Sequence, residues 1–222
     1  MTDWADGLTL WHSRWDEGRI GFHREAVNTH LQAHADALLA DAERVLVPLC
    51  GKSVDMPWLL DRGVEVVGVE LVPRAVEQFF AAQGWSAARS ELGGLSAWTH
   101  GQLTVLQGDI FAVGHEHAGT VDAIYDRAAI IALPPDVQQR YVDHLHGLLR
   151  PGGRMLLLTY DMPLPATQGP PFSVSPDKVP DLFQAFSSIS ELSTTMLTPE
   201  TDAKLARRGV DWAREVVWMI DK

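Results

Sequence analysis

The chain is short of cysteine, of basic residues and of long apolar runs. Its one cysteine, Cys50, excludes an intramolecular disulfide and fits a reducing compartment. The 18 lysines and arginines are outnumbered by 29 acidic residues, and a net charge of −11 repels nucleic acid from most of the surface. No apolar stretch approaches a membrane span, and the N-terminal MTDWADGLTLW lacks the basic start of a signal peptide. We therefore expect a cytoplasmic protein with no nucleic-acid partner and no membrane partner.

Metal-ligand patterns are missing as well. His30 and His34 have a spacing that places both on one side of a helix, but the sequence offers no third ligand that we can name for them. None of the nine histidines combines this spacing with a carboxylate partner. We therefore expect no metal site.

The composition is that of one folded domain. With 222 residues, 46% of them hydrophobic, the chain can bury one sizeable core and is short for two. Aliphatic and β-branched runs alternate with helical patterns, which predicts an α/β fold with a doubly wound, mostly parallel sheet. The last two runs leave no room between them for a helix like the earlier ones, so they predict an antiparallel pair. The seven expected strands are 44–48, 64–69, 103–107, 121–125, 154–160, 189–197 and 210–220.

The N-terminal segment stands out by its tryptophans. Three of the eight, Trp4, Trp11 and Trp15, have helical spacing. We expect residues 1–40 to be helical, with Asn28 capping the second helix, and residues 41–222 to form the α/β core of the same domain. Trp11 and Trp15 are one helical turn apart, and such a pair usually packs in the core. The more specific alternative is that they cover a cofactor. Later helices are expected at 54–61, 73–82, 134–149 and 179–186, with the Pro-Gly-Gly at 151–153 as a turn.

Residues 45–70, VLVPLCGKSVDMPWLLDRGVEVVGVE, read as strand, tight turn, helix and strand. This is the front half of a nucleotide-binding βαβ unit. Leu49, Cys50 and Gly51 allow backbone to approach a ligand at the turn. Glu70 ends the second strand, where a carboxylate can accept hydrogen bonds from both hydroxyls of a ribose. The alternative for Glu70 is an ordinary surface carboxylate.

Three nucleotides compete for this unit. A P-loop needs a glycine where Leu46 stands, so the GKS at 51–53 does not make a phosphate cradle. NAD needs glycines at the turn for its pyrophosphate, and PLC at 48–50 occupies it. S-adenosylmethionine (SAM) has a ribose diol and no phosphate, and needs an adenine contact after the third strand, where Asp109 stands. The residues favour SAM, although Asp109 also suits a simple turn cap.

A series of motifs then resembles a known family. The motifs are W-x3-W-x6-FH from Trp11, PLCGKS-x-D from Pro48, GVE from Gly68, GDIF from Gly108, YDRAAIIALPP from Tyr125 and GPPFSV from Gly169. Together they cover nearly the whole chain and resemble the bacterial branch of the thiopurine S-methyltransferase family. The resemblance implies a class I SAM-dependent methyltransferase: a seven-stranded sheet whose last strand pair is reversed, with residues 1–40 as an N-terminal helical flap and cover.

The resemblance also implies an activity. The family methylates the sulfur of aromatic or heterocyclic thiols, thiopurines among them, and it suggests selenium or tellurium species as further acceptors in metalloid detoxification. The partners implied are SAM, its product S-adenosylhomocysteine and a small-molecule thiol or metalloid acceptor, bound by a monomer. The implied SAM contacts are Trp11, Leu49, Glu70, Asp109, Ile110 and Arg127, and the implied acceptor contacts are Phe22 and Arg127. The family often has an arginine before the last strand, where this chain has Lys204 with Arg207 and Arg208 nearby.

The chemistry of the acceptor side agrees with this resemblance. Methyl transfer from a sulfonium is an in-line displacement, and an aromatic thiol is partly thiolate near neutral pH. A guanidinium favours the thiolate by its charge, so Arg127, after the fourth strand, is the predicted catalytic residue. The DRAA at 126–129 differs from the [ND]-P-P-[YFW] of many amine methyltransferases, and a cysteine nucleophile is excluded because Cys50 lies at the cofactor turn.

Three alternatives stay open at this point. Asp126 and Arg127 could form a structural ion pair. The chain could bind SAM without catalysis, as a sequestering protein in metalloid resistance. An NAD-dependent oxidoreductase is the weakest alternative, because the glycine fingerprint is missing.

Overall fold

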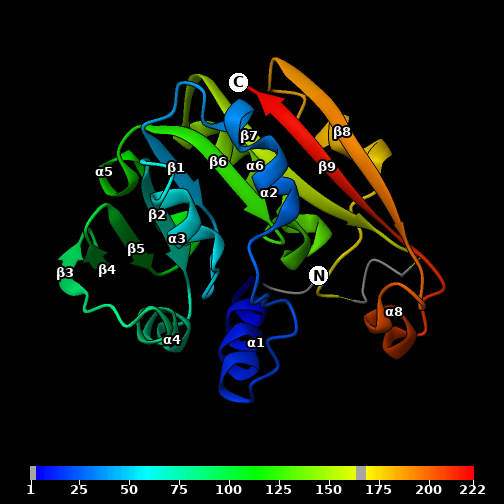
Figure 1. Cartoon of the computed structure of the whole chain (residues 1–222), viewed down its shortest axis with the longest axis horizontal. Coiled ribbons are helices and arrows are strands. Elements are labelled where there is room, and N and C mark those ends of the chain that lie inside the picture. Colours follow the sequence, from blue (N-terminus) through cyan, green and yellow to red (C-terminus); the bar gives the residue numbers. More distant parts are fainter. Residues whose placement is uncertain (1–3, 164–168) are drawn as a thin grey trace.

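The computed structural model describes residues 4–163 and 169–222 (Figure 1). The strands in this part of the chain form one sheet in the order β3-β4-β5-β2-β1-β6-β7-β9-β8. The five strands from β5 to β7 in that order run parallel, and the pairs at both ends are antiparallel. The strands are β1 Arg44–Val47, β2 Glu65–Glu70, β3 Ala88–Leu92, β4 Leu95–His100, β5 Leu103–Gln107, β6 Val121–Arg127, β7 Leu149–Asp161, β8 Ser188–Leu197 and β9 Ala213–Asp221.

Helices cover both faces of the sheet, and each face has its own apolar core. In β1, Val45 and Val47 pack on the side of α2, α3 and α4, whereas Leu46 packs on the side of α6 and α7, as the two-residue period of a strand requires. The helices are α1 Trp4–Asp16, α2 Thr29–Leu38, α3 Asp55–Leu60, α4 Pro73–Gln83, α5 His115–Ala118, α6 Pro135–Leu148, α7 Val179–Leu182 and α8 Ala203–Arg208, with 3₁₀ turns η1 Ile110–Ala112, η2 Ile130–Ala132 and η3 Pro176–Lys178.

The predicted fold class is confirmed, and the sheet is two strands wider than the predicted seven. The additional strands, β3 and β4, form a hairpin at the edge beside β5. Every residue of β3 is exposed, so its sequence carries no apolar pattern. The turn between them is Gly93-Gly94, with φ of +57° and +92°, and two consecutive glycines were the one available sign of this hairpin.

Three local predictions are wrong. β7 continues through 151–153, where a turn was predicted, and the chain bulges there: Leu149 pairs with Val121, and the next pair is Arg154 with Ala123. α7 is a single turn instead of the predicted helix 179–186. A short helix, α8, fits between β8 and β9, where none was predicted.

The N-terminal helices lie as the sequence suggests. The Asn28 side chain accepts hydrogen bonds from the amides of His30 and Leu31 and caps α2. Helix α1 lies below the sheet in Figure 1, near the start of α4, where the exposed ion pair Arg74–Asp16 joins the two. The division into a flap, residues 1–40, and a core, residues 41–222, stays a prediction, and residues 1–3 are outside the described part.

Candidate functional site

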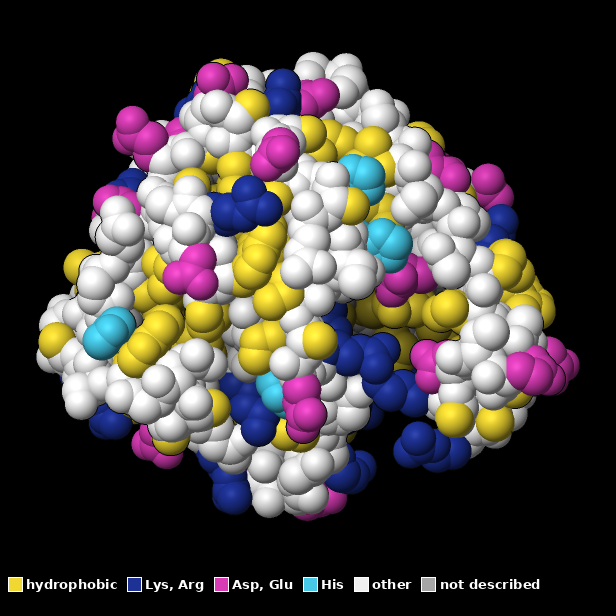
Figure 2. Space-filling view, viewed as in Figure 1, with side chains coloured by type: hydrophobic (Ala, Val, Ile, Leu, Met, Phe, Trp, Pro, Cys, Tyr) yellow, Lys and Arg dark blue, Asp and Glu magenta, His cyan; other side chains and the backbone are white. Residues whose placement is uncertain are grey.

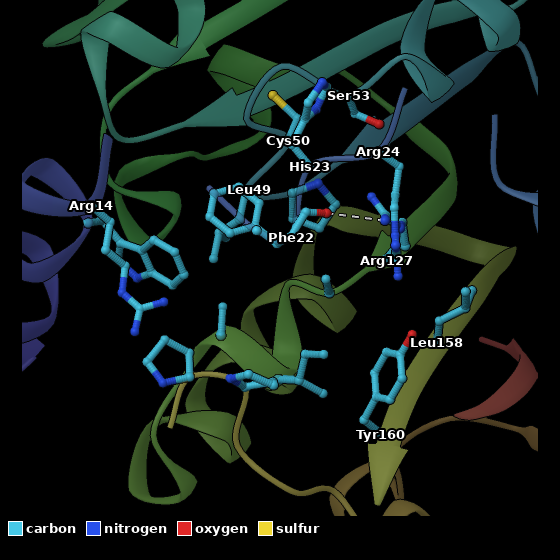
Figure 3. Close-up of a pocket in the computed structure, with 18 of the residues that line it drawn as sticks. Arg14, Phe22, His23, Arg24, Leu49, Cys50, Ser53, Arg127, Leu158 and Tyr160 are labelled. Carbon is cyan, nitrogen blue, oxygen red and sulfur yellow. Dashed lines mark hydrogen bonds between the residues drawn. The ribbon is translucent and has the colours of Figure 1, made fainter. Parts of the chain in front are cut away.

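A cavity of about 470 Å³ lies where the parallel strands β1, β2 and β6 end, between the sheet and α1. Crevices at the carboxyl ends of parallel strands are the usual ligand sites of such sheets, and this volume is typical of a small-molecule pocket. Figure 3 shows the side chains that converge on the cavity from the turn after β1, from β6 and from β7. All the residues predicted for the site line it: Trp11, Phe22, Leu49, Glu70, Asp109, Ile110 and Arg127.

The turn after β1 brings backbone against this cavity. Leu49 has φ +47°, a left-handed conformation that costs a side-chain-bearing residue about 1 kcal/mol, and Gly51 has φ +53°. A Cβ on Gly51 would lie 3.3 Å from the Trp15 ring, so α1 packs directly on the turn. The Cys50 amide donates to Val69 O at 2.9 Å and ties the turn to the end of β2. The turn is therefore held close to Glu70.

Glu70 is 6% exposed and serves the turn as well as the cavity. Its Oε2 accepts from the Gly51 amide at 2.8 Å and its Oε1 from the Val72 amide at 2.7 Å. The reading of Glu70 as an ordinary surface carboxylate is therefore wrong. A carboxylate has about four acceptor positions, so Glu70 keeps acceptor capacity for a diol on its cavity side. This fits a nucleoside ribose. The turn lacks the glycines that a phosphate-bearing nucleotide needs, which fits SAM.

We expect this burial to make stability depend on pH. Burial raises the pKa of Glu70 from 4.5 to about 7, against the opposing effect of the backbone amides. The folded protein thus holds this proton more tightly than the unfolded chain, and the resulting stabilisation is complete below pH 4.5 and lost as the pH rises through about 7. Between these limits wild type should lose about 3 kcal/mol of unfolding free energy that the Glu70→Gln variant keeps. Urea unfolding of both proteins at several pH values measures this difference, and parallel pH profiles would contradict it.

Asp109 caps the 3₁₀ turn that follows β5. Its side chain accepts from the Phe111 amide at 3.0 Å. The turn-cap reading is therefore confirmed, while a contact with adenine stays a prediction. The capped turn places Ile110 in the core at the cavity wall, 3% exposed.

Phe22 and Arg127 meet on the other side of the cavity. Nη2 of Arg127 donates to Phe22 O at 3.3 Å, the dashed line in Figure 3. The Phe22 ring stands edge-on to Trp11 and Trp15, with ring centres 5.6 and 5.8 Å apart. Trp15 is 2% exposed and Trp11 is less buried, and both line the cavity, so Trp15 packs in the core while a contact of either with the cofactor stays a prediction. The aromatic cluster of Trp11, Trp15 and Phe22 is thereby joined to the end of β6.

Asp126 does not form the structural ion pair with Arg127 that the sequence left open. It is fully buried, and Tyr141 donates its hydroxyl to Oδ2 at 2.8 Å. Oδ1 accepts from the amides of Ala129 and Ile130 at 2.9 and 3.3 Å. These bonds fold the loop after β6, in which Ala128 takes φ +70°. Asp126 thus shapes the loop and leaves the Arg127 guanidinium to the cavity.

We expect Asp126→Ala to be strongly destabilising. The change strands three buried donors, and each unsatisfied group costs about 1–3 kcal/mol, so the unfolding free energy should fall by about 3 kcal/mol or more. Asp126→Asn keeps one oxygen for the two amides and should lose less. Urea unfolding at neutral pH measures both, and a loss below about 1 kcal/mol in the alanine variant would contradict the assignment.

Sequence reasoning missed half of the basic residues at the cavity, namely Arg14, Arg19, Arg24 and Lys52. Among the described residues, eight cationic and four acidic side chains border it. Figure 2 shows Lys and Arg side chains gathered around the hollow in the lower half of the molecule. Lys204, the departure from the family pattern, lines the cavity and donates to Gly21 O at 2.6 Å, while Arg208 donates to Pro170 O at 3.0 Å. The cationic residues are Arg14, Arg19, Arg24, Lys52, Arg127, Lys204, Arg207 and Arg208.

His23 also lines the cavity, and Tyr160 and Glu215 do so from β7 and β9. Burial and the charges of Lys52 and Arg127 lower the pKa of His23, so its imidazole is neutral at neutral pH. No sequence signal marked Tyr160 or Glu215, because neither lies in a motif with known spacing. Only the pairing of two distant strands brings them together.

The fold and this site together define a class I SAM-dependent methyltransferase. Among solved structures, the chain is similar to the 1,6-didemethyltoxoflavin-N1-methyltransferase of Burkholderia thailandensis, with a TM-score of 0.66 and 18% identity over 99% of this chain and 89% of that one. It is also similar to the N-methyltransferase NodS of Bradyrhizobium japonicum, with a TM-score of 0.59 and 13% identity over 87% and 85% of the two chains. At these identities the likeness supports the fold.

The sequence comparisons are closer and give the family. The family model of thiopurine S-methyltransferases matches residues 7–222. The chain is 41% identical to the thiopurine S-methyltransferase of Pseudomonas paraeruginosa, over 96% of this chain and 98% of the relative. It is 40% identical to that of Legionella pneumophila, strain Paris, over 97% and 98%. The chain belongs to the thiopurine S-methyltransferase family, and its cofactor is SAM.

Two further findings describe what the residues 4–163 and 169–222 lack. No helix in these ranges combines the length and the apolar character needed to cross a membrane. Nor do these residues bring three or more His, Cys, Asp or Glu side chains together as a metal site would.

Proposed function

We propose that this enzyme transfers the methyl group of SAM to the sulfur of aromatic or heterocyclic thiols. The observation that carries the proposal is that Glu70 and Arg127 line one cavity at the ends of β2 and β6. Glu70 would hold the ribose, and Arg127, beside Phe22, would hold the acceptor. The wider set proposed for SAM comprises Trp11, Leu49, Glu70, Asp109, Ile110 and Arg127.

The division of labour follows from charge. SAM, when bound, supplies an electrophilic methyl group on a sulfonium. Arg127 stabilises the acceptor as an anion, since a positive charge a few ångströms away lowers the pKa of a thiol. The aromatic cluster around Phe22 excludes water and orients a flat ring, which keeps the nucleophile aligned for in-line displacement.

The surplus of cationic side chains at the cavity supports anionic acceptors more generally. The whole chain carries a net charge of −11, whereas the cavity is lined by more lysines and arginines, eight, than acidic residues. The charge around the cavity is therefore opposite in sign to that of the whole chain. Such a field concentrates anions at the entrance. We therefore extend the proposal to oxyanions of selenium and tellurium, which would give the enzyme a part in metalloid detoxification.

The proposal describes a monomer in the cytoplasm that acts on small molecules. Every residue assigned to the two ligands lies in one chain and borders one cavity, so a partner subunit is not needed to complete the site. Light scattering coupled to gel filtration tests the monomer, and a mass of two or more chains would overturn it.

Mass spectrometry of a reaction with SAM and 6-mercaptopurine tests the proposal, with the Arg127→Ala variant in parallel. S-methylated thiopurine from wild type and much less from the variant is expected. Selenite and tellurite are tested in the same assay. SAM binding by calorimetry without a methylated product from any acceptor would favour the alternative, a SAM-binding protein in metalloid resistance that does not catalyse.

A further inference from the structure

A hydrogen-bonded chain of three side chains runs from the cavity wall towards the surface. The Tyr160 hydroxyl donates to Oε2 of Glu215. The other carboxylate oxygen, Oε1, lies 2.9 Å from Nε2 of His30. Tyr160 and Glu215 line the cavity, while the His30 side chain is 22% exposed. We call these three residues the Tyr160 chain.

The fold builds this chain from three distant segments. Tyr160 of β7 and Glu215 of β9 are directly opposite in the antiparallel ladder, so their side chains stand on the same face of the sheet. His30 lies in the first turn of α2, which packs on β7. In Figure 3 the hydroxyl end of Tyr160 is turned towards Arg127, the proposed acceptor contact.

The charges around Tyr160 keep its phenol protonated. Burial and the Glu215 carboxylate raise the pKa of Tyr160 above its ordinary value. Arg24, from the loop before α2, and Arg127, from β6, act in the opposite direction without reversing this. A phenol in this state does not serve as a base by itself. It can take up a proton only while it passes its own to a neighbour, and Glu215 is placed to receive it.

We propose that Glu215, acting through the Tyr160 hydroxyl, accepts the proton that a neutral acceptor loses when it is methylated. This inference rests on the proposed function and extends it to acceptors that are not already anions. His30 acts as a positioning residue that holds the Glu215 carboxylate directed at Tyr160.

The step balances in protons and electrons. The S–H bond of the acceptor, or the ring N–H of its thione tautomer, breaks, and its proton moves to the Tyr160 oxygen as the phenol proton moves to Oε2 of Glu215. The electron pair that is released leaves the acceptor sulfur free to form the new bond to the methyl carbon, while the pair of the broken C–S bond stays on the sulfur of S-adenosylhomocysteine. Glu215 later loses the proton to water. No oxidant or reductant is required.

The competing explanation is that the Tyr160 chain only fastens α2 to the sheet. Two thiols of similar shape separate the explanations: 4-nitrothiophenol, which is ionised at neutral pH, and 4-methylthiophenol, which is mostly protonated in slightly acidic buffer. A proton acceptor matters for the second thiol and not for the first. A structural tie matters equally for both.

The experiment measures kcat/KM for both thiols with full-length wild type, Tyr160→Phe and Glu215→Gln. Tyr141→Phe is the matched control, because it also removes a hydroxyl bonded to a carboxylate, Asp126, but in the core outside the cavity lining. In slightly acidic buffer, Tyr160→Phe and Glu215→Gln should lose about five- to tenfold with 4-methylthiophenol, because the thiolate fraction already present in solution still reacts without a base. With 4-nitrothiophenol they should stay within about threefold of wild type, since no proton transfer is needed.

Two further readouts make the result decisive. Alkaline buffer should restore 4-methylthiophenol methylation in both variants, because the thiol then ionises without help. SAM binding measured by calorimetry should be unchanged in both. Equal losses with the two thiols at every pH, or no loss with either, would overturn the inference. If wild type methylates neither thiol and no other thiol, the proposed function fails instead.

Discussion

Replacing Glu70 with alanine is expected to weaken SAM binding about 10- to 150-fold. A hydrogen bond to a charged group contributes roughly 1.5–3 kcal/mol, and each 1.4 kcal/mol is a tenfold change in affinity. Glu70 is nearly fully buried at the cavity wall, so water does not replace the lost acceptor efficiently. Isothermal titration calorimetry with SAM measures the effect directly and without any turnover.

The same substitution also removes hydrogen bonds that hold the fold, and the experiment must separate this effect from the loss of SAM binding. Glu70 accepts from the amides of Gly51 and Val72, and alanine leaves both without this partner. The titration is therefore run well below the melting temperature of the variant. Glu65→Ala is the control, because Glu65 starts the same strand and pairs with Arg44 far from the cavity lining. Unchanged SAM affinity in a folded Glu70→Ala protein would remove Glu70 from the cofactor site.

Replacing Arg127 with alanine is expected to lower kcat about 100-fold with an aromatic thiol, and to weaken SAM binding by less. The size is that of losing one preorganised group that stabilises developing or existing negative charge in a shielded site. The substitution also frees the Phe22 carbonyl, so part of the loss arises from a looser aromatic cluster. Steady-state kinetics at saturating SAM gives kcat, and calorimetry gives the SAM affinity.

Two companion variants define the cause of the Arg127 effect. Arg127→Lys keeps the positive charge without the planar fork and should retain intermediate activity. Arg62→Ala removes an exposed arginine that stacks on Trp58 outside the cavity lining, and it should behave as wild type. Full activity of Arg127→Ala with a thiopurine would exclude Arg127 as the catalytic residue.

Much of the fold was predictable because its signals are local. A β-branched run such as 64–69 indicates a buried strand, and Pro73 and Gly84 begin and end a helix by their own backbone preferences. The same holds for the edge of the sheet that carries the cavity, since the parallel strands all end there. The β3–β4 hairpin was not predicted, because β3 buries no side chain and apolar periodicity indicates only strands that bury one face.

The residues of the candidate site that lie at strand ends were predictable from the sequence, and the contacts that distant segments make around them were not. Glu70 ends β2, and Leu49 and Asp109 stand two residues after the ends of β1 and β5, so their position in the sequence fixes their position at the cavity. Lys204 is different, because it reaches Gly21 across 183 residues of chain. Neither the spacing nor the chemistry of Lys204 indicates that neighbour.

The sequence by itself determined the class of fold, the edge of the sheet at which the cavity lies, and the acidic residue that we propose for the ribose. These follow from backbone preferences and side-chain periods, which act over a few residues. Only the tertiary structure decided that Asp126 shapes a loop instead of pairing with Arg127, and that Tyr160, Glu215 and His30 are joined. Contacts of this kind depend on strand register and on how a helix packs, and many distant residues set these together.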